Sequence, residues 1–339
     1  MDSLTHITLG ACVGEMVLGK KLGKKALFWG ALSQCLPDID TIVAALFPAD
    51  QAFLIHRGFT HSVLFAFVIG FILVFAVKKI HQKTRIAFSL LAFFFCFQLL
   101  LHDLLDTCNS YGTGLLEPFS PQRFSINLLY VADPFFTISF FAAASLLLFK
   151  SSNNKNRATW AALAAAVSAC YLVIAGVNKT YIHHRAEVSF QAQKISPPGY
   201  FITPAPFNCM LWYIVADSGR NYYTGYSSIF DDSRKNIVFE QYPKNYTLLS
   251  KTADPKAIQD LVTFADGYYT LSRSNDITYL NVLRFEQVRG WEQQNAPFVF
   301  SYPLAPHNKQ ALLLQRARLA EWDMQTFKNY ITRIAGDQK

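Results

Sequence analysis

Four long apolar runs limit what this chain can fold into. None of them contains Asp, Glu, Lys or Arg, and each approaches the roughly 20 residues that a helix needs to cross a bilayer. A soluble helical core does not explain four such runs in one half of a chain, so we predict four membrane-spanning helices. The runs are Phe59–Val77, Ile86–Leu101, Pro134–Phe149 and Ala158–Gly176.

Two shorter segments, Ile7–Gly19 and Ala26–Leu36, precede these runs and are rich in Gly, Ala and Ser. Small residues let helix backbones approach closely in lipid, so we predict a tightly packed helical pair, buried or partly inserted. A soluble core would also explain these two segments taken alone. Glu15 is the only acid inside a segment, and we interpret it either as a partner of a metal ligand or as an interface residue near Lys20. Residues 1–177 are therefore predicted to form an α-helical membrane domain of about six helical segments, four of them clearly spanning.

Positive charge in this half is concentrated in three short connections. Of the 13 Lys and Arg residues in residues 1–176, 11 lie in these connections. The positive-inside rule places the connections in the cytoplasm. We therefore expect a multi-pass protein of the cell membrane with both termini outside. The 11 residues are Lys20, Lys21, Lys24, Lys25, Lys78, Lys79, Lys83, Arg85, Lys150, Lys155 and Arg157.

From about Asn178 the composition changes to that of a soluble α+β domain. The segments after this point are rich in β-branched and aromatic residues, as strands are. The turn pairs Ser218-Gly219 and Asn275-Asp276 predict two hairpins. We therefore predict a smaller, extracytoplasmic α+β domain over residues 178–339.

Two helices are predicted in this second domain. The first follows Asp254, which is placed to cap it, and Gly267 marks its end. The second runs from about Lys309 to Ile334, where basic residues alternate with apolar ones to form an amphipathic face.

Composition argues against a nucleic-acid partner and leaves open whether two of the cysteines form a disulfide. The net charge is +8, but no long basic run with interleaved aromatics is present, so we expect no nucleic-acid partner. Of six cysteines, only Cys108 and Cys209 lie in polar surroundings. We interpret them as two free thiols, with one disulfide as the alternative.

The polar residues at the outer ends of the segments are mainly histidine and aspartate, which are the usual ligands of zinc and related divalent ions. His102 and Asp106 are four residues apart and share one helix face, together with Gln98 and Asn109. Asp103 faces away from this pair and is predicted to be a solvated end charge. We predict a shared site for one or two metal ions, most simply Zn²⁺, with Mn²⁺ and Fe²⁺ as alternatives. The candidate ligands are His6, Asp38, Asp40, His56, His61, His102 and Asp106.

Each of these residues also has an ordinary structural interpretation. Asp38 and Asp40 could cap helices or turns after Pro37, and an isolated histidine at a helix end is usually an interfacial residue. Arg57 is a candidate catalytic residue that binds a phosphate or stabilises negative charge; alternatively, it pairs with Asp50 or with lipid phosphate.

Several motifs together resemble the YdjM-type family of membrane-bound, metal-dependent hydrolases. They are "THITLG", "PDID", "HRGFTHS", "HDLLDTCNSYG" and "ADP", and the resemblance covers roughly residues 1–180. The rest resembles the C-terminal extension of the YfhP-like branch of that family. The resemblance implies a bacterial inner membrane protein and assigns ligand roles to His6, Asp38 or Asp40, His56, His61, His102 and Asp106. The "HxxxD" pair also looks like the ligand pair of zinc-dependent phospholipase C.

Two functions follow from this site. The first is a membrane-embedded hydrolase that uses a metal-activated water on a phosphoester or lipid-like substrate at the outer face, with membrane lipid as its surroundings. Whichever of Asp38 and Asp40 is not a ligand is then the candidate base, and Asp40 is the one chosen here. The alternative is a non-catalytic structural or sensory metal site whose outer domain binds a partner.

Overall fold

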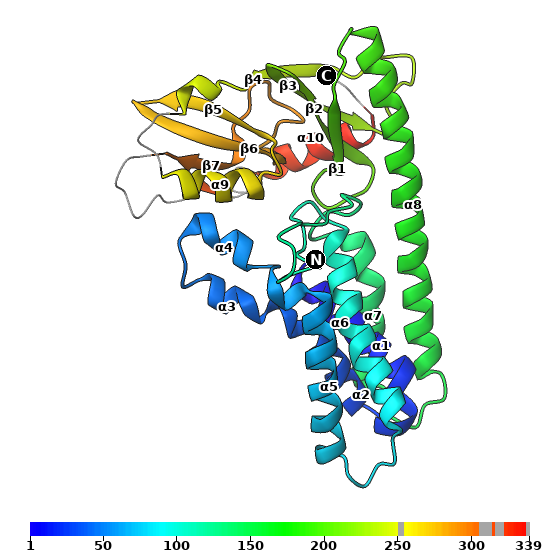
Figure 1. Cartoon of the computed structure of the whole chain (residues 1–339). Helices are drawn as coiled ribbons and strands as arrows, with labels where there is room; N and C mark the ends of the chain where they lie inside the picture. The colour runs from blue at the N-terminus through cyan, green and yellow to red at the C-terminus, as the bar shows by residue number, and fades with distance from the viewer. Residues whose placement is uncertain (250–253, 305–313, 316–321, 337–339) are drawn as a thin grey trace. The chain divides into compact units, whose positions relative to one another are not determined.

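The chain folds into two compact units in the computed structural model (Figure 1). The first contains Met1–Ala45 and Ile55–Ile174, and the second contains Leu46–Leu54 and Ala175–Lys339. The structure describes residues 1–249, 254–304, 314–315 and 322–336. The first unit is helical, and the second combines two antiparallel sheets with helices.

The prediction of a helical N-terminal region with several apolar helices is confirmed. Three of the described helices, α5, α6 and α8, are long and apolar enough to cross a membrane, and α7 is apolar but shorter. Two one-turn 3-10 helices, Pro37–Ile39 and Phe59–His61, and the short helices α3 (Asp40–Ala44) and α4 (Ala49–Ile55) lie between the longer elements. The longer helices are α1 (Ser3–Leu22), α2 (Lys25–Cys35), α5 (Val63–Ile80), α6 (Phe88–Thr107), α7 (Pro134–Phe149) and α8 (Arg157–Ala192).

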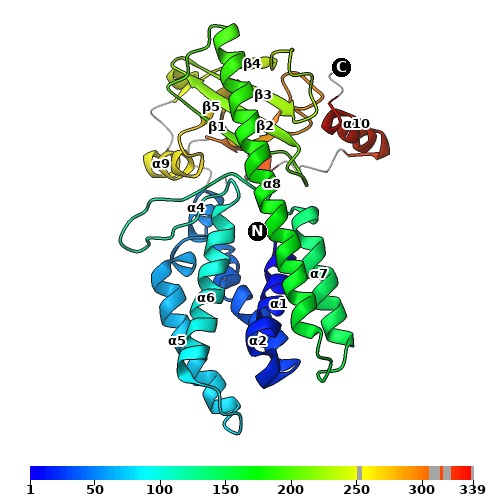
Figure 2. The same cartoon turned by 90° about the vertical axis from the view of Figure 1, so that its right-hand side faces the viewer.

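Helix α1 is longer than its apolar run predicts. It extends over 20 residues because Asp2 caps its first turn by accepting a hydrogen bond from the Thr5 N–H. The predicted tight packing against α2 is confirmed, since a Cβ atom at Gly10 or Gly30 would collide with the carbonyl oxygen of the other glycine. Helix α1 also packs against α7, while α5 packs against α6, as Figure 2 shows.

The outward faces of these helices are apolar. On α5, Val68, Ile72 and Phe75 are 50%, 56% and 63% exposed, and Leu163 and Val173 are similarly exposed on α8. Large aliphatic and aromatic side chains exposed in this number are unfavourable in water, but they are what a lipid environment requires.

A buried ion pair joins α1 to the start of α8. The Arg157 guanidinium donates to both Glu15 carboxylate oxygens, at 2.9 and 2.7 Å, and both side chains are almost fully buried. It also donates to the carbonyl oxygens of Leu147 and Lys150 at the end of α7. Neither sequence interpretation of Glu15 is correct. Arg157, counted above among the connection charges, holds three helices together instead.

The second unit contains two four-stranded antiparallel sheets, each in sequential order. Both predicted hairpins are confirmed, because Ser218 pairs with Asn221 and Ser274 with Ile277. The first sheet contains β1 (Gly199–Pro204), β2 (Leu211–Ser218), β3 (Asn221–Ser228) and β4 (Phe239–Pro243). The second contains β5 (Tyr269–Ser274), β6 (Ile277–Gln287), β7 (Phe298–Pro303) and β8 (Leu314–Gln315).

One predicted helix of this unit is confirmed, and the other is confirmed over its C-terminal part but wrong at Leu314–Gln315. Helix α9 (Pro255–Phe264) has Asp254 as its N-cap, as expected. The second helix, α10, covers only Met324–Ile334, with Asp323 as its N-cap. Leu314–Gln315 pair with β7 as a strand, so the predicted start at Lys309, itself outside the described residues, is too early. Its predicted apolar residues Leu312, Leu313 and Leu319 also lie outside the described residues.

The buried ion pair gives a first prediction. Replacing Glu15 with Gln leaves the Arg157 guanidinium buried without a countercharge, which should lower the free energy of unfolding by about 3–5 kcal/mol. Thermal unfolding of the purified protein in detergent measures this loss. Lys155→Gln, at an exposed position in the same connection, is the matched control and should melt like the parent. Equal melting temperatures for Glu15→Gln and Lys155→Gln would show that the pair does not stabilise the bundle.

Candidate metal centre

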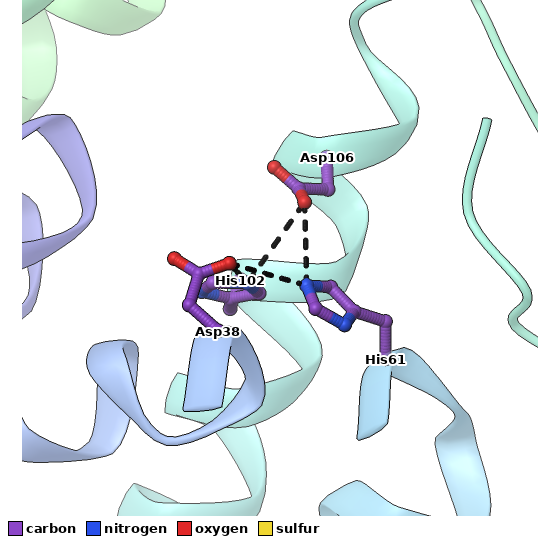
Figure 3. Close-up of side chains that lie close together, drawn as sticks. All are labelled: Asp38, His61, His102 and Asp106. Atoms are coloured by element: carbon purple, nitrogen blue, oxygen red, sulfur yellow. Dashed lines mark ion pairs between the residues drawn. The ribbon is translucent and has the colours of Figure 1, made fainter. Parts of the chain in front are cut away.

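Four of the predicted ligands converge in the helical unit. Asp38, His61, His102 and Asp106 each offer one ligand atom, and these atoms all lie within 4.8 Å of one another. The His61 Nε2 atom is 3.5 Å from an oxygen of Asp38 and 3.5 Å from an oxygen of Asp106. Figure 3 shows the four side chains pointing toward one another from three separate stretches of chain.

Local structure explains how each stretch presents its ligands. His102 and Asp106 lie one turn apart on α6, so both point to the same side. Pro37 ends α2 and starts the one-turn helix that carries Asp38. His61 ends the other one-turn helix, directly before Ser62, whose hydroxyl accepts from the Phe65 N–H and caps α5.

The imidazoles are oriented by partners outside the cluster. The Nδ1 atom of His102 lies 2.8 Å from the Gln34 carbonyl oxygen, and Nδ1 of His61 lies 3.2 Å from an Asp40 oxygen. An Nδ1–H that donates outward leaves Nε2 as a free acceptor toward the cluster. This is the arrangement found in histidines that bind metals.

His6 is the fifth member of the same arrangement. Its Nδ1 atom lies 3.0 Å from the Gln34 side-chain oxygen, and its Nε2 atom lies 3.2 Å from an oxygen of Asp106. Its ring stacks on that of His102, with 3.8 Å between the centroids. The amino group of Met1 also forms an ion pair with Asp106.

Three inward-facing atoms are buried without a hydrogen-bond partner within the described part of the chain: His61 Nε2, His102 Nε2 and Asp106 Oδ2. A buried polar atom left unpaired costs about 1–3 kcal/mol, and three in one place need a common explanation. Burial acts to raise the pKa of Asp38, but the adjacent imidazoles of His61 and His102 outweigh it and lower the pKa to about 2. The cluster therefore combines an ionised carboxylate with imidazole nitrogens, a set of ligand types that fits a divalent cation.

Asp40 and His56 lie beside the cluster rather than in it. The Asp40 oxygens contact His56 Nδ1 at 2.7 Å, the Arg57 N–H at 3.0 Å and the Thr60 hydroxyl, in addition to His61. With four donors around it, Asp40 is placed to hold other groups in position. His56 is half-buried, and its ring lies 5.7 Å from that of His61 between centroids.

Arg57 points at the cluster from a strained backbone conformation. Its φ of 65° lies in the left-handed region, which is rare for a residue with a side chain and is often seen at functional sites. The guanidinium Nε lies 3.2 Å from Asp106, and Nη1 donates to Asn109 at 2.7 Å. Burial lowers the pKa of Arg57 to about 10, so the side chain remains charged at neutral pH.

Sequence reasoning missed Gln34 and misjudged Asp103. Gln34 is buried within an apolar helix and contacts both His6 and His102, and Gln98, one turn before His102, in turn holds the Gln34 amide. A polar residue in an apolar segment is the signal that could have identified Gln34, as it identified Gln98. Asp103 is 2% exposed, so the expected solvated end charge is wrong. It is covered by packing around α6.

The comparison with known families matches the part of the chain that carries this cluster. Residues 1–182, more than half of the chain, match the model described as "YdjM inner membrane protein". The chain belongs to the YdjM family of inner membrane proteins. The resemblance stated from the motifs is therefore confirmed at the level of the family, whose description names a location and no activity.

Two relatives support this membership. The chain is 35% identical over 123 residues to the inner membrane protein YbcI of Escherichia coli, covering 36% of this chain and 69% of that protein. It is 29% identical over 159 residues to the uncharacterized protein YfhP of Bacillus subtilis, covering 43% of this chain and 46% of that protein. No solved structure matches the chain significantly.

The partners of the histidines give a second prediction. Asp40→Asn removes the charge that orients His61, and loss of such an outer partner typically weakens metal binding by about 10–100-fold. We expect a drop of that size in zinc affinity, measured by competition with a chromogenic chelator in detergent. Glu187→Gln, at a position that is 51% exposed on α8, should leave affinity unchanged. Parent-like affinity in Asp40→Asn would show that His61 needs no such orientation.

Proposed function

We propose that this protein is a membrane-embedded, metal-dependent hydrolase that acts on a phosphoester at the outer membrane face. The observation that carries the proposal is the set of buried atoms without a hydrogen-bond partner, His61 Nε2, His102 Nε2 and Asp106 Oδ2, which share one small space with Asp38. Evolution rarely leaves such atoms unpaired unless something else occupies the space between them.

Four residues are proposed as ligands: Asp38, His61, His102 and Asp106. His6 is the fifth candidate, because its Nε2 atom faces the same Asp106 carboxylate. Two imidazoles and two carboxylates suit Zn²⁺, with Mn²⁺ or Fe²⁺ as alternatives. A bound divalent cation supplies an activated water and polarises a phosphoryl oxygen.

The side chains beside the ligands are proposed to stabilise charge, to hold other groups in position and to transfer a proton. Arg57 carries a buried positive charge next to Asp106, where it stabilises negative charge that develops on a phosphoryl group. Asp40, chosen as the base from sequence, is proposed here as a positioning residue, because its oxygens are already occupied. His56 is then the candidate proton shuttle, since Asp40 holds its Nδ1 atom and its side chain remains 29% exposed.

The proposed topology follows from charge and helix length. We propose that the lysine-rich connections face the cytoplasm, that α5, α6, α7 and α8 cross the membrane, and that both termini lie outside. Helix α7 has 16 residues, about 24 Å at roughly 1.5 Å per residue, which suffices with slight local thinning of the bilayer. The second unit is then extracytoplasmic.

A non-catalytic metal site is the competing function. A structural site is closed by protein ligands, whereas a hydrolytic site keeps one position for water. The charged guanidinium of Arg57 beside Asp106 favours catalysis, because a purely structural site gains nothing from a cation next to its ligand.

Metal content and hydrolysis test the proposed function together. The protein purified in detergent should contain a divalent metal by elemental analysis and should hydrolyse bis(p-nitrophenyl) phosphate. Chelation should abolish turnover, and adding zinc or manganese back should restore it. His102→Ala should lose both metal and activity. His81→Ala, which lies at the other end of α5, is the matched control and should retain both. Metal-free parent protein, or full turnover in His102→Ala, would refute the proposal.

Arg57 gives a separate prediction. Arg57→Lys keeps the charge but loses the fork of donors, so kcat/KM should fall by about 10²–10³-fold while metal content is unchanged. Arg85→Lys, the same change at an exposed position in a lysine-rich connection, should behave like the parent. A parent-like rate in Arg57→Lys would remove Arg57 from the catalytic group.

A further inference from the structure

The one edge of the cluster that reaches the surface is bordered by apolar side chains. Asp38 is 19% exposed, whereas the side chains of His61, His102 and Asp106 are at 0%. Directly after Asp38 the chain exposes a series of aliphatic residues with helical spacing. They are Ile39 (52%), Ile42 (71%) and Val43 (48%).

Helix geometry gives the depth of the cluster in the bilayer. In α1, His6 precedes Lys20 by 14 residues, which is about 21 Å at roughly 1.5 Å per residue. In α6, His102 follows the first residue, Phe88, by 14 residues, which is again about 21 Å. These two helices therefore place the histidines at one height above the lysine-rich boundary.

That height is less than the thickness of the membrane. The hydrocarbon core of a bilayer is about 30 Å thick, so a point about 21 Å from one boundary lies about 9 Å inside the other. Any tilt of the helices places the point deeper still. The cluster, and the exposed apolar side chains beside it, then lie at the depth of the leaflet opposite the lysines.

Exposed apolar side chains also surround the stretch that carries His61 and the start of α5. Phe59, two residues before His61, is 47% exposed, and Val63 and Phe67 follow on α5 at 39% and 44%. Exposed apolar groups thus extend from both stretches that carry Asp38 and His61. Both the depth and these exposed apolar side chains fit a lipid acyl chain as the occupant.

We propose that the substrate is a phosphoester lipid of the outer leaflet, which enters laterally past Ile39 and Ile42 and presents its head group at Asp38. This inference rests on the proposed function for its chemistry, but its geometry stands alone. The acyl chains lie against the exposed side chains of Ile39, Ile42 and Val43, and the phosphoester reaches the carboxylate edge without leaving the bilayer.

Fluorescence quenching tests the geometry independently of activity. Ile42→Cys and, as matched control, Thr41→Cys are made in a Cys170→Ser background, because Cys170 is the native cysteine that is exposed. Both are labelled with bimane in vesicles of phosphatidylethanolamine and phosphatidylglycerol. The signal of the Cys170→Ser protein without an added cysteine, treated in the same way, is subtracted. Brominated phospholipid should quench the label at 42 at least twofold more than the label at 41, and iodide should show the reverse order. Iodide access to 42 equal to that at 41 would overturn the proposal, and so would protection of 42 from both quenchers, which would indicate a protein partner.

Activity on two substrates tests the route. The double variant Ile42→Asn/Val43→Asn should hydrolyse water-soluble bis(p-nitrophenyl) phosphate at the parental rate but lose about tenfold in turnover of a bilayer-embedded phospholipid. Thr41→Asn should change neither rate. Equal loss on both substrates, or on neither, contradicts lateral entry. Absence of metal-dependent turnover on either substrate in the parent would instead refute the hydrolase itself, so the two failures are distinguishable.

Discussion

The helical unit depends on one constraint: three buried imidazoles must aim their Nε2 atoms at one space within an apolar bundle. Each is fixed from behind, His6 and His102 by Gln34 and His61 by Asp40. Gln34 can serve two histidines only because α1 and α2 are in backbone contact at Gly10 and Gly30. The close helix packing and the polar cluster are therefore two parts of one structure, and a side chain at either glycine would separate Gln34 from His6.

Charged side chains hold the helices of this unit together at two separate ends. Glu15 and Arg157 neutralise each other where α1 meets α8, and that pair also satisfies carbonyl groups at the end of α7. Asp133 at the other end accepts from the first turn of α7 and from the Tyr171 hydroxyl. Because unpaired charge is costly in lipid, the ion pair and the hydrogen bonds of Asp133 hold the helices together. The helices then keep the residues of the cluster aligned with one another.

The sequence predicted which residues form the site better than it predicted which of them contact one another. Periodicity placed His102 and Asp106 on one face of a regular helix, and it could do so because α6 keeps that regularity. It could not separate His56 from His61, since His56 follows the end of α4 and His61 lies in a separate one-turn helix, so their spacing does not place them on one face. Asp38 and Asp40 could not be separated either, because a one-turn helix gives way to α3 between them. The contacts that separate them come from Thr60 and the Arg57 N–H, which are distant in sequence.

The irregular backbone near the cluster needs hydrogen-bond partners from elsewhere in the protein, whereas a helix supplies its own. At membrane depth each free N–H and C=O group needs a partner in the protein. The stretch around Arg57 meets it from several sides: the Arg57 N–H donates to Asp40, and the Arg57 carbonyl accepts from the Gly114 N–H at 2.8 Å. The Arg123 guanidinium donates to the carbonyl groups of His56 and Arg57. The loop after α6 is thus the structural complement of "HRGFTHS". It supplies hydrogen-bond partners for the backbone groups that precede α5. The turn at Arg57, with a φ of 65°, can therefore hold the guanidinium beside Asp106.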